Sequence, residues 1–419
     1  MVRPGHTRID RWRLAASDRA ASRTGRRDRR DRSGAHRPPG PPSGAAARRR
    51  GRHARGARGV AAPRPRRLLP QPRRSSAPWR TARGSSSAGP PRGRRHGDSD
   101  DVRGTGRRVG RAAHLTSVPR LRFGVIGAAW IADRAVLPAL RAAHNADAVA
   151  IASRSPNRAA AMAKRHDVAR VHPTYDALLE DETVDAVYIA LVNSLHLPWT
   201  LRALEAGKHV LCEKPLGVDA SEVRQMARAA SSFGLTLMEA FMYRFHPRMR
   251  ALRESADYVR FLNASFGFAL HDSGNPRLRV ELGGGALLDV GCYTLDAARW
   301  FCGEPDAVSA VARVGAVDIS VAAALHFPGG AEATVWASLD SPEHQELVLV
   351  TGDKIVRIEQ PFTAWHDPDD PYQLMVEAFS QSVLDGSPAP LSLDDSTATA
   401  RLMDRVRGSW TAISESATR

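Results

Sequence analysis

The feature that most constrains the fold is an alternation of short apolar runs with helical segments between residue 121 and about residue 240. The apolar runs are LRFGVIG (121–127), AVAIAS (148–153), VDAVYIAL (184–191), HVLCEKP (209–215) and LTLMEAF (235–241). Helical spacing marks LHLPWTLRALEAGK (195–208) and VDASEVRQMARAASSFG (218–234), the latter opened by an Asp219/Glu222 capping box and closed by Gly234. This alternation predicts a doubly wound parallel sheet, with ligands at the carboxyl ends of its strands.

The turn after the first run is rich in small residues. Gly127-Ala128-Ala129-Trp130-Ile131-Ala132 is a G-x-A-x-x-A variant of the dinucleotide fingerprint G-x-G-x-x-G/A. Gly127 would make the tight turn, Ala132 would allow close helix–strand packing, and the helix N-terminus would hold a pyrophosphate. Ala129 replaces the glycine that lets the backbone approach the phosphates, so an ordinary strand–helix turn is the competing interpretation.

The second run ends without the acidic residue that binds the ribose 2′-hydroxyl in NAD enzymes. It is followed instead by SRSPNR, which contains Ser153, Arg154, Ser155 and Arg158. Hydroxyl and guanidinium groups suit a 2′-phosphate, so we expect NADP(H), with NAD as the alternative. A solvated turn that begins a helix would look similar.

Lys214 stands where the fourth apolar run ends. Two charges at the edge of a core, Glu213 and Lys214, are costly unless they are paired or used. Because Lys214 lies at a predicted carboxyl strand end, it is a candidate functional residue. A structural ion pair with Glu213 is the alternative.

Period-2 stretches dominate the chain after residue 241: VRFLNASFGFAL (259–270), ISVAAALHFPGGAEATVWASL (319–339) and QELVLVTGDKIVRIE (345–359). They predict an open, mostly antiparallel sheet with the 283–300 helical region against one face, closed by helices within 372–386 and 397–410. We therefore expect an α/β chain with a Rossmann domain at 118–240 and an α+β domain for substrate binding and oligomerisation at 241–419.

The first 117 residues differ in composition from the rest. They contain 32 arginines, no lysine and 7 acidic residues, a net charge of +25, whereas the remainder carries a net charge of −8. Few large apolar residues occur, so we expect this segment to be disordered. A mis-set translation start, with Val118 as the true start, is the favoured interpretation; an arginine-rich nucleic-acid-binding arm is the less favoured one.

Other classes of protein are disfavoured. Cys212, Cys292 and Cys302 are odd in number and lack C-x-x-C spacing, which supports neither a disulfide framework nor a zinc site and fits a cytoplasmic location. No apolar run reaches the length of a membrane span, and we expect no membrane partner.

Several motifs together resemble the glucose–fructose oxidoreductase / inositol dehydrogenase (Gfo/Idh/MocA) family. They are Asn193-x-x-His196, Gly207-Lys208-His209-Val210, Glu213-Lys214-Pro215, MEAFMYRFHPR (238–248) and GGGALLDVGCYTLDAARWFCGEP (283–305). The resemblance runs from about Leu121 to the C-terminus. It is strongest to the branch of dihydrodiol dehydrogenases and NADP-dependent xylose dehydrogenases.

The resemblance implies a role for each matching residue. Lys214 would lie beside the nicotinamide and the substrate, Tyr293 would exchange the proton, and Asp289 would share its helix face. Pro215 would follow a cis peptide bond, and the outer face of the second sheet would build a homodimer or homotetramer. The expected cofactor-binding residues are Gly127, Ala129, Trp130, Ile131, Ser153, Arg154, Arg158, Asn193, His196, Glu213 and Lys214; for His196 a packing role and for Asp289 a helix-capping role compete.

The chemistry of alcohol oxidation fits these residue types. Tyrosine, with a pKa of about 10, is a poor base at neutral pH, and a nearby ammonium group favours its phenolate and a developing alkoxide. We therefore expect an NADP(H)-dependent oxidoreductase acting on a sugar, cyclitol or vicinal diol. A catalytically silent sugar or nucleotide sensor on the same fold is the alternative, although it would need neither Lys214 nor Tyr293.

Overall fold

The computed structural model describes residues 119–363 and 369–414. The expectations about the arginine-rich segment 1–117 lie outside these residues.

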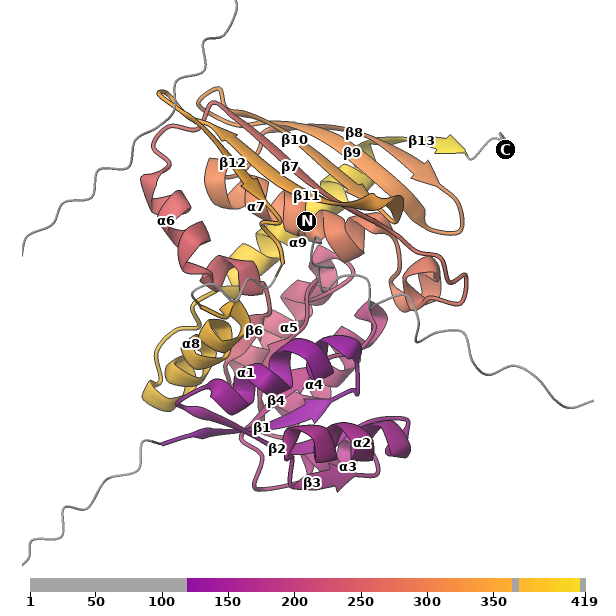
Figure 1. Ribbon diagram of the computed structural model, residues 1–419, viewed down its shortest axis with the longest axis vertical. Coiled ribbons are helices and arrows are strands. Elements are labelled where there is room, and N and C mark those ends of the chain that lie inside the picture. Colours follow the sequence, from indigo (N-terminus) through magenta and orange to yellow (C-terminus); the bar gives the residue numbers. More distant parts are fainter. Residues whose placement is uncertain (1–118, 364–368, 415–419) are drawn as a thin grey trace, which may run out of the picture. The chain divides into compact units, whose positions relative to one another are not determined.

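The first sheet has six parallel strands in the order β3-β2-β1-β4-β5-β6 (Figure 1). The strands are β1 (Leu121–Ile126), β2 (Ala146–Ala152), β3 (Arg170–His172), β4 (Ala186–Ile189), β5 (His209–Cys212) and β6 (Leu237–Glu239). This order reverses between β1 and β4, the switch point at which dinucleotide-binding sheets hold their ligand. The predicted doubly wound sheet is confirmed, with β3 added at an edge.

Helices connect these strands. They are the π-helical segment η2 (Ala132–Val136) continued by α1 (Leu137–Ala142), then α2 (Pro156–His166), α3 (Tyr175–Leu179), the short 3-10 turn η3 (Asn193–Leu195) with α4 (His196–Glu205), and α5 (Ala220–Phe233). Asp219 caps α5 by accepting from the Glu222 N–H at 2.9 Å, and Gly234 ends it with φ of 66°. The reciprocal half of the predicted capping box is wrong by one residue, because the Glu222 carboxylate accepts from the N–H of Val218.

The chain crosses to the second sheet through the 3-10 turn η4 (Met242–Phe245) and α6 (Pro247–Ser255). The second sheet has the order β12-β11-β7-β10-β9-β8-β13. Its strands are β7 (Phe261–Ala269), β8 (Ala307–Val314), β9 (Asp318–His326), β10 (Glu332–Ser338), β11 (Asp340–Val350), β12 (Ile355–Glu359) and β13 (Trp410–Ser414). Only β7–β10 and β8–β13 pair in parallel, so the sheet is mostly antiparallel, as expected.

One face of this sheet is covered by the helical region that follows β7. Turns η5 (Pro276–Leu278) and η6 (Val280–Leu282) lead into the π-helical segment η7 (Leu287–Gly291) and α7 (Cys292–Cys302), and α9 (Leu393–Ser409) packs beside them (Figure 1). The carboxylate of Asp318, at the start of β9, accepts from the Leu287 N–H at 2.6 Å and so caps the start of this helix.

The remaining helix, α8 (Pro371–Asp385), packs against the first sheet although it comes late in the chain. The rings of Phe123 on β1 and Phe379 on α8 have centroids 5.8 Å apart. The side-chain amide of Asn145 donates to the carbonyl of Glu377 at 3.0 Å. The first sheet is therefore completed by a helix from beyond residue 241.

None of the helices in the described ranges is long and apolar enough for a membrane crossing. Within the same residues, no group of three or more His, Cys, Asp or Glu side chains could hold a metal ion.

Candidate active site

Lys214 lies two residues after the end of β5 and points to the helical region that covers the second sheet. Its Nζ donates to the carbonyl of Asp289 at 2.7 Å and lies 3.5 Å from the Asp289 carboxylate oxygen Oδ1. The same Nζ lies 4.8 Å from the centroid of the Tyr293 ring. The side chain is only 14% exposed, and the Lys214–Pro215 peptide bond is cis, as the resemblance implied. The loop after β5 therefore brings Lys214 to Asp289 on η7 and Tyr293 on α7.

His196 holds the backbone next to Lys214. It is fully buried, its Nδ1 lies 2.8 Å from the carbonyl oxygen of Pro215, and its Nε2 lies 3.2 Å from that of Leu191. Burial lowers the pKa of His196 to about 4, so the neutral ring can donate to only one of the two carbonyls. This placement gives His196 a packing and anchoring role, and the suggested contact with a cofactor stays a prediction.

Two buried carboxyl groups, those of Glu213 and Glu239, also fix the backbone segment around Lys214. Glu213 accepts a hydrogen bond from the Tyr188 hydroxyl, and Glu239, which ends β6, accepts from the Leu216 N–H at 2.8 Å. Burial raises the pKa of both carboxyl groups, that of Glu239 to about 7. Lys214 thus stands on a backbone that is tied at Glu213, Pro215 and Leu216.

Asp289 lies between two cations. Its Oδ1 faces Lys214, and its Oδ2 accepts from Nε of Arg277 at 2.7 Å. Burial alone would raise the pKa of Asp289, but the Lys214 ammonium and the Arg277 guanidinium hold it below its ordinary value. Burial would likewise lower the pKa of Lys214, but Asp289 raises it above the usual value. Both groups are therefore charged at neutral pH.

Tyr293 is the second residue of α7 and lies inside a group of aromatic rings. The rings of Phe241, Tyr243, Phe266 and Phe362 lie with centroids 5.4–6.0 Å from its own. Its hydroxyl has no hydrogen-bond partner in the part of the chain that the structure describes. Burial, with Glu213, Cys292 and Asp289, raises the pKa of Tyr293 well above the ordinary value, and Arg277 opposes the rise. Lys214 lies over the ring face, not at the hydroxyl, and the tyrosine is protonated at neutral pH.

The Gly-rich turn lies at the carboxyl edge of β1. Gly127 has φ of 104°, and a Cβ there would overlap the carbonyl oxygen of Ala190, so only glycine fits. Ala129 is partly buried, and the helix starts at Trp130, with Trp130 exposed and Ile131 partly buried. A tight turn at Gly127 that leads into a helix N-terminus fits the pyrophosphate of a dinucleotide. Ala129 still takes the place of the glycine that gives the closest backbone approach.

The charged segment after β2 lies beside this turn. Nη2 of Arg158, on α2, donates to the carbonyl of Ala128 at 2.6 Å. Ser153 and Ser155 cap the local turn, since Ser153 Oγ accepts from the Ser155 N–H and Ser155 Oγ accepts from the Arg158 N–H. Arg154 is exposed at the end of β2. The two arginines, with no carboxylate at this strand end, fit a 2′-phosphate.

Asn193 bridges the two halves of the site. Its side-chain amide donates to the carbonyl of Gly283 at 2.8 Å, and a Cβ at Gly283 would approach the Asn193 side chain too closely. The loop that precedes the Tyr293 helix is thereby fixed to the loop after β4.

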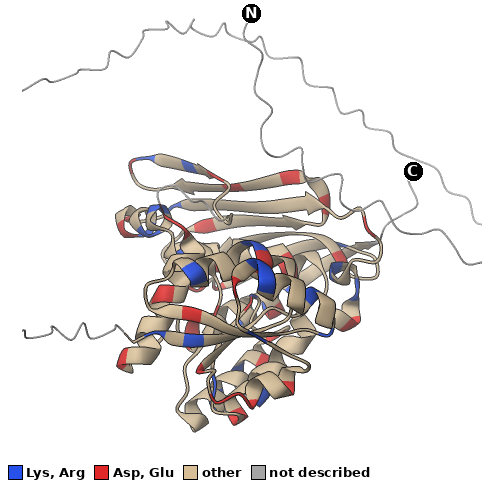
Figure 2. Cartoon of the chain, turned by 60° about the horizontal axis from the view of Figure 1, so that its bottom comes forward, with Lys and Arg blue, Asp and Glu red and all other residues tan. Residues whose placement is uncertain are grey.

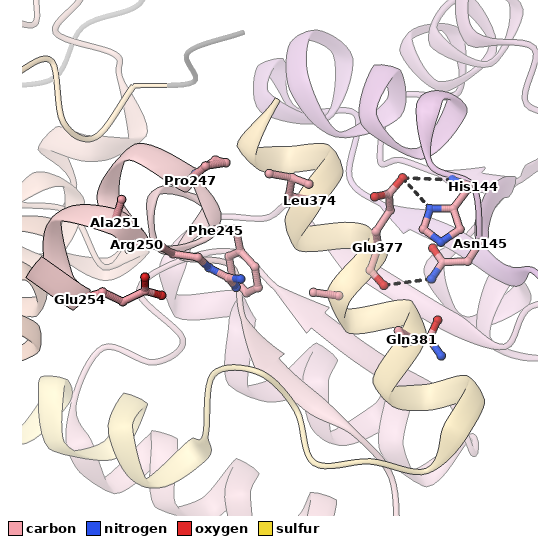
Figure 3. A pocket seen from close by; sticks show the side chains of 11 residues that line it. His144, Asn145, Phe245, Pro247, Arg250, Ala251, Glu254, Leu374, Glu377 and Gln381 are labelled. Carbon is pink, nitrogen blue, oxygen red and sulfur yellow. Dashed lines mark hydrogen bonds and ion pairs between the residues drawn. The ribbon is translucent and has the colours of Figure 1, made fainter. Parts of the chain in front are cut away.

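A separate pocket of about 560 Å³ lies between α6, α8 and the turn before β2 (Figure 3). It is lined in part by His144, Arg250 and Glu377, and the Glu377 carboxylate binds His144. None of the predicted site residues lines it, so the chemistry of Lys214 and Tyr293 lies elsewhere.

Comparisons with known proteins agree with this arrangement. Residues 121–241 match the family described as "Oxidoreductase family, NAD-binding Rossmann fold", and residues 257–356 match the "GFO/IDH/MocA C-terminal domain". The chain belongs to the Gfo/Idh/MocA oxidoreductase family. The predicted family is therefore confirmed, together with an oxidoreductase class and an NAD-binding Rossmann domain.

Three members of the Gfo/Idh/MocA family illustrate the similarity. D-xylose 1-dehydrogenase (NADP(+)) 2 of Haloferax volcanii is 36% identical over 313 residues, covering 68% of this chain and 96% of the relative. Trans-1,2-dihydrobenzene-1,2-diol dehydrogenase of Mus musculus is 39% identical over 233 residues, covering 53% and 69%. The crystal structure of a 3-ketoreductase from Actinomadura kijaniata with NADP and TDP-benzene has a TM-score of 0.64 and 32% identity, covering 71% of this chain and 100% of that one.

Proposed function

We propose that this chain is an NADP(H)-dependent oxidoreductase that interconverts an alcohol and a carbonyl on a sugar, cyclitol or vicinal diol. The observation that supports it most is that Lys214, Asp289 and Tyr293 lie together. The Lys214 Nζ, just after β5, lies 4.8 Å from the ring centroid of Tyr293, in the first turn of the helix α7 that covers the second sheet. A silent sensor would not require this pair.

Tyr293 acts as the proton donor and acceptor at the substrate oxygen. Its raised pKa keeps the hydroxyl protonated at neutral pH, and in reduction this proton goes to the carbonyl oxygen. The surrounding aromatic rings fix the orientation of the Tyr293 ring. In the oxidising direction the same oxygen takes the proton of the substrate hydroxyl.

Lys214 supplies the fixed positive charge. A carbonyl oxygen that gains a hydride at its carbon develops negative charge, and an ammonium group held in a buried site stabilises this charge strongly. Two contacts of Nζ go to Asp289, and the ammonium has three donors, so one remains for the substrate oxygen. The nicotinamide cofactor, when bound, supplies the hydride in reduction and accepts it in oxidation.

The residues around β1 and β2 support NADP(H) as the cofactor. Arg154 and Arg158 provide positive charge where the ribose 2′ position would lie, and no acidic residue competes there. The relatives also point this way, since the Haloferax volcanii enzyme is named for NADP(+) and the Actinomadura kijaniata structure contains NADP.

The sugar and diol class is supported by what the relatives act on according to their names, D-xylose and a trans-dihydrodiol. The solved structures similar to this chain include lysine and tyrosine variants of the Actinomadura kijaniata 3-ketoreductase. A lysine and a tyrosine were thus single targets of substitution in a similar protein.

A spectrophotometric screen tests the proposal. The purified chain is mixed with NADP⁺ or NADPH and a panel of aldoses, cyclitols, trans-diols and ketosugars, and absorbance of the reduced nicotinamide is followed. Turnover of at least one member, lost in Tyr293→Phe, is expected. Binding of NADPH without turnover of any member would favour the sensor.

A further inference from the structure

Arg277 is a charged side chain at the site that no sequence motif singled out. It lies in η5, and its carbonyl accepts from the Gly285 N–H at 2.9 Å. A Cβ at Gly284 would overlap that carbonyl, so the glycine run before the Tyr293 helix packs directly on the backbone of Arg277. The position of Arg277 is therefore built into the start of this helix.

The Arg277 guanidinium group is held through its Nε atom. Nε donates to Asp289 Oδ2 at 2.7 Å, and the guanidinium carbon lies 5.9 Å from the Phe268 ring centroid. The side chain is 48% exposed, and its Nη groups make no hydrogen bond within the described residues. Arg277 thus binds the oxygen of Asp289 that Lys214 does not face.

Three charges of alternating sign follow from this geometry: Arg277, Asp289 and Lys214. With two groups alone, the Asp289 carboxylate would neutralise the Lys214 ammonium. With Arg277 present, the carboxylate is shared and the set keeps one net positive charge next to the reacting groups.

The net positive charge of Arg277, Asp289 and Lys214 acts on the ionisation of Tyr293. The titratable groups around it are Lys214, Glu213, Cys292, Asp289, Arg277, Tyr243 and Tyr372. Among the groups that set its pKa, Glu213, Cys292 and Asp289 act to raise it, and Arg277 acts to lower it.

We propose that Arg277 is a positioning residue of the reaction, which binds Asp289 through Oδ2, leaves the Lys214 ammonium incompletely neutralised, and adds a second positive charge that acts on Tyr293. The inference rests on the function proposed above. It gives the loop at 275–283 a role in the chemistry as well as in the fold.

The first test uses three variants on one loop. Arg277→Gln removes the charge, Arg277→Lys keeps it but loses the planar fork, and Arg279→Gln removes a neighbouring charge that pairs with Glu281 instead of the site. Arg277→Gln should lower kcat by roughly tenfold, less than removal of a group that touches the transition state. The Michaelis constant for NADP(H) should stay within about twofold of that of the parent chain, because the cofactor residues are untouched.

The pH profile separates positioning from folding. In the oxidising direction, the limb that requires deprotonated Tyr293 should move to higher pH in Arg277→Gln, because the phenolate loses a stabilising charge. Arg277→Lys should restore part of kcat and of the profile, and Arg279→Gln should match the parent chain. A profile of Arg277→Gln that coincides with that of Arg279→Gln overturns the proposal, as does a loss that Arg277→Lys does not relieve at unchanged Tm.

A second readout needs no turnover. The chain has only four lysines, Lys164, Lys208, Lys214 and Lys354, so acylation by a small anhydride can be followed for each by peptide mass spectrometry. Arg277→Gln should slow acylation of Lys214 several-fold relative to exposed Lys354, because Arg277 opposes the rise in the Lys214 pKa. Equal or faster labelling overturns the charge argument. An inactive parent chain with the expected labelling change would instead contradict only the proposed reaction.

Discussion

At the scale of single residues, Tyr293 and Lys214 divide the chemistry between a proton and a charge. Tyr293→Phe removes only the hydroxyl, and phenylalanine fits the aromatic group formed with Phe241 and Phe266. We expect kcat to fall by about 10²–10⁴-fold while Tm stays close to that of the parent chain. Tyr258→Phe is the matched control, since Tyr258 is exposed. Near-normal kcat in Tyr293→Phe would assign proton transfer to another group.

The second residue-scale prediction concerns the cofactor. Arg154→Asp and Arg158→Asp should each raise Kd for NADPH by at least tenfold more than Kd for NADH, because a carboxylate repels the 2′-phosphate and suits a 2′-hydroxyl. Titration of cofactor fluorescence measures both constants. Lys164→Asp makes a comparable charge change at the far end of α2 and should affect both cofactors alike. Equal losses at Arg154 and Arg158 for NADPH and NADH would refute a 2′-phosphate site.

The sequence predicted the residues that belong to local motifs. Lys214, Asp289 and Tyr293 stand in short motifs whose spacing is visible along the chain, and the structure brings them together. Arg277 was missed because an arginine in a polar loop has the same local pattern whether it meets solvent or Asp289. Only the folded backbone brings the two side chains within 2.7 Å.

At the scale of elements, β5 and β6 end at or next to the two buried carboxyl groups, Glu213 and Glu239, that fix the backbone around Lys214. Glu239 ends β6, and its raised pKa of about 7 results chiefly from burial. Between about pH 4.5, the ordinary value for the carboxyl group, and about pH 7, the folded chain keeps the proton and the unfolded chain releases it. The contribution of Glu239 to the free energy of unfolding therefore falls as pH rises through this window, and levels off above it.

Glu239→Gln tests this dependence. The substituted side chain keeps an oxygen for the Leu216 N–H but carries no titratable proton. Relative to the variant, the parent chain should lose up to about 3 kcal/mol of unfolding free energy between pH 4.5 and pH 7. Urea unfolding at pH 5 and pH 8 measures the difference. For Glu205→Gln, at an exposed position of α4, the change in unfolding free energy with pH should equal that of the parent chain. An equal change in Glu239→Gln would contradict a raised pKa for the Glu239 carboxyl group.

Element prediction failed where local pattern and tertiary pairing diverge. The strand β3 has three residues, too few for a period to show. The strand β13 starts at Trp410, directly after α9 ends at Ser409, with no turn residue between them. Its strand conformation comes from parallel pairing with β8, a partner about 100 residues earlier. Such pairings are absent from any local window of the sequence.

At the scale of the whole folded unit, the second sheet presents an outer face that the described helices do not cover (Figure 1). The strand registers place Val348, Asn263, Thr334, Ala324 and Ser309 in one row across it, and Glu346, Ser265, Trp336, Ala322 and Val311 in the next. Lys and Arg are interspersed with Asp and Glu over the described elements (Figure 2). From β11 to β8 these rows contain a single charged residue, Glu346, and they continue onto the edge strand β12 with Arg357 and Glu359. Broad, weakly charged sheet faces are suited to pairing with a second copy.

The outer face of the second sheet is the expected site of self-assembly. If a second copy covers it, as the family resemblance implies, then Ala324→Lys combined with Val311→Lys should place uncompensated charges at the interface and shift the chain toward monomer. Light scattering after size-exclusion chromatography measures the molar mass. Because the two lysines should raise the dissociation constant of the assembly, the mass of the double variant should fall on dilution. Leu384→Lys, an exposed apolar position on α8, is the control and should leave the mass unchanged. Because Tyr293 lies on the opposite side of the same sheet, through α7, loss of the partner should lower Tm more than it lowers kcat. An unchanged mass in the double variant would contradict assembly through this face.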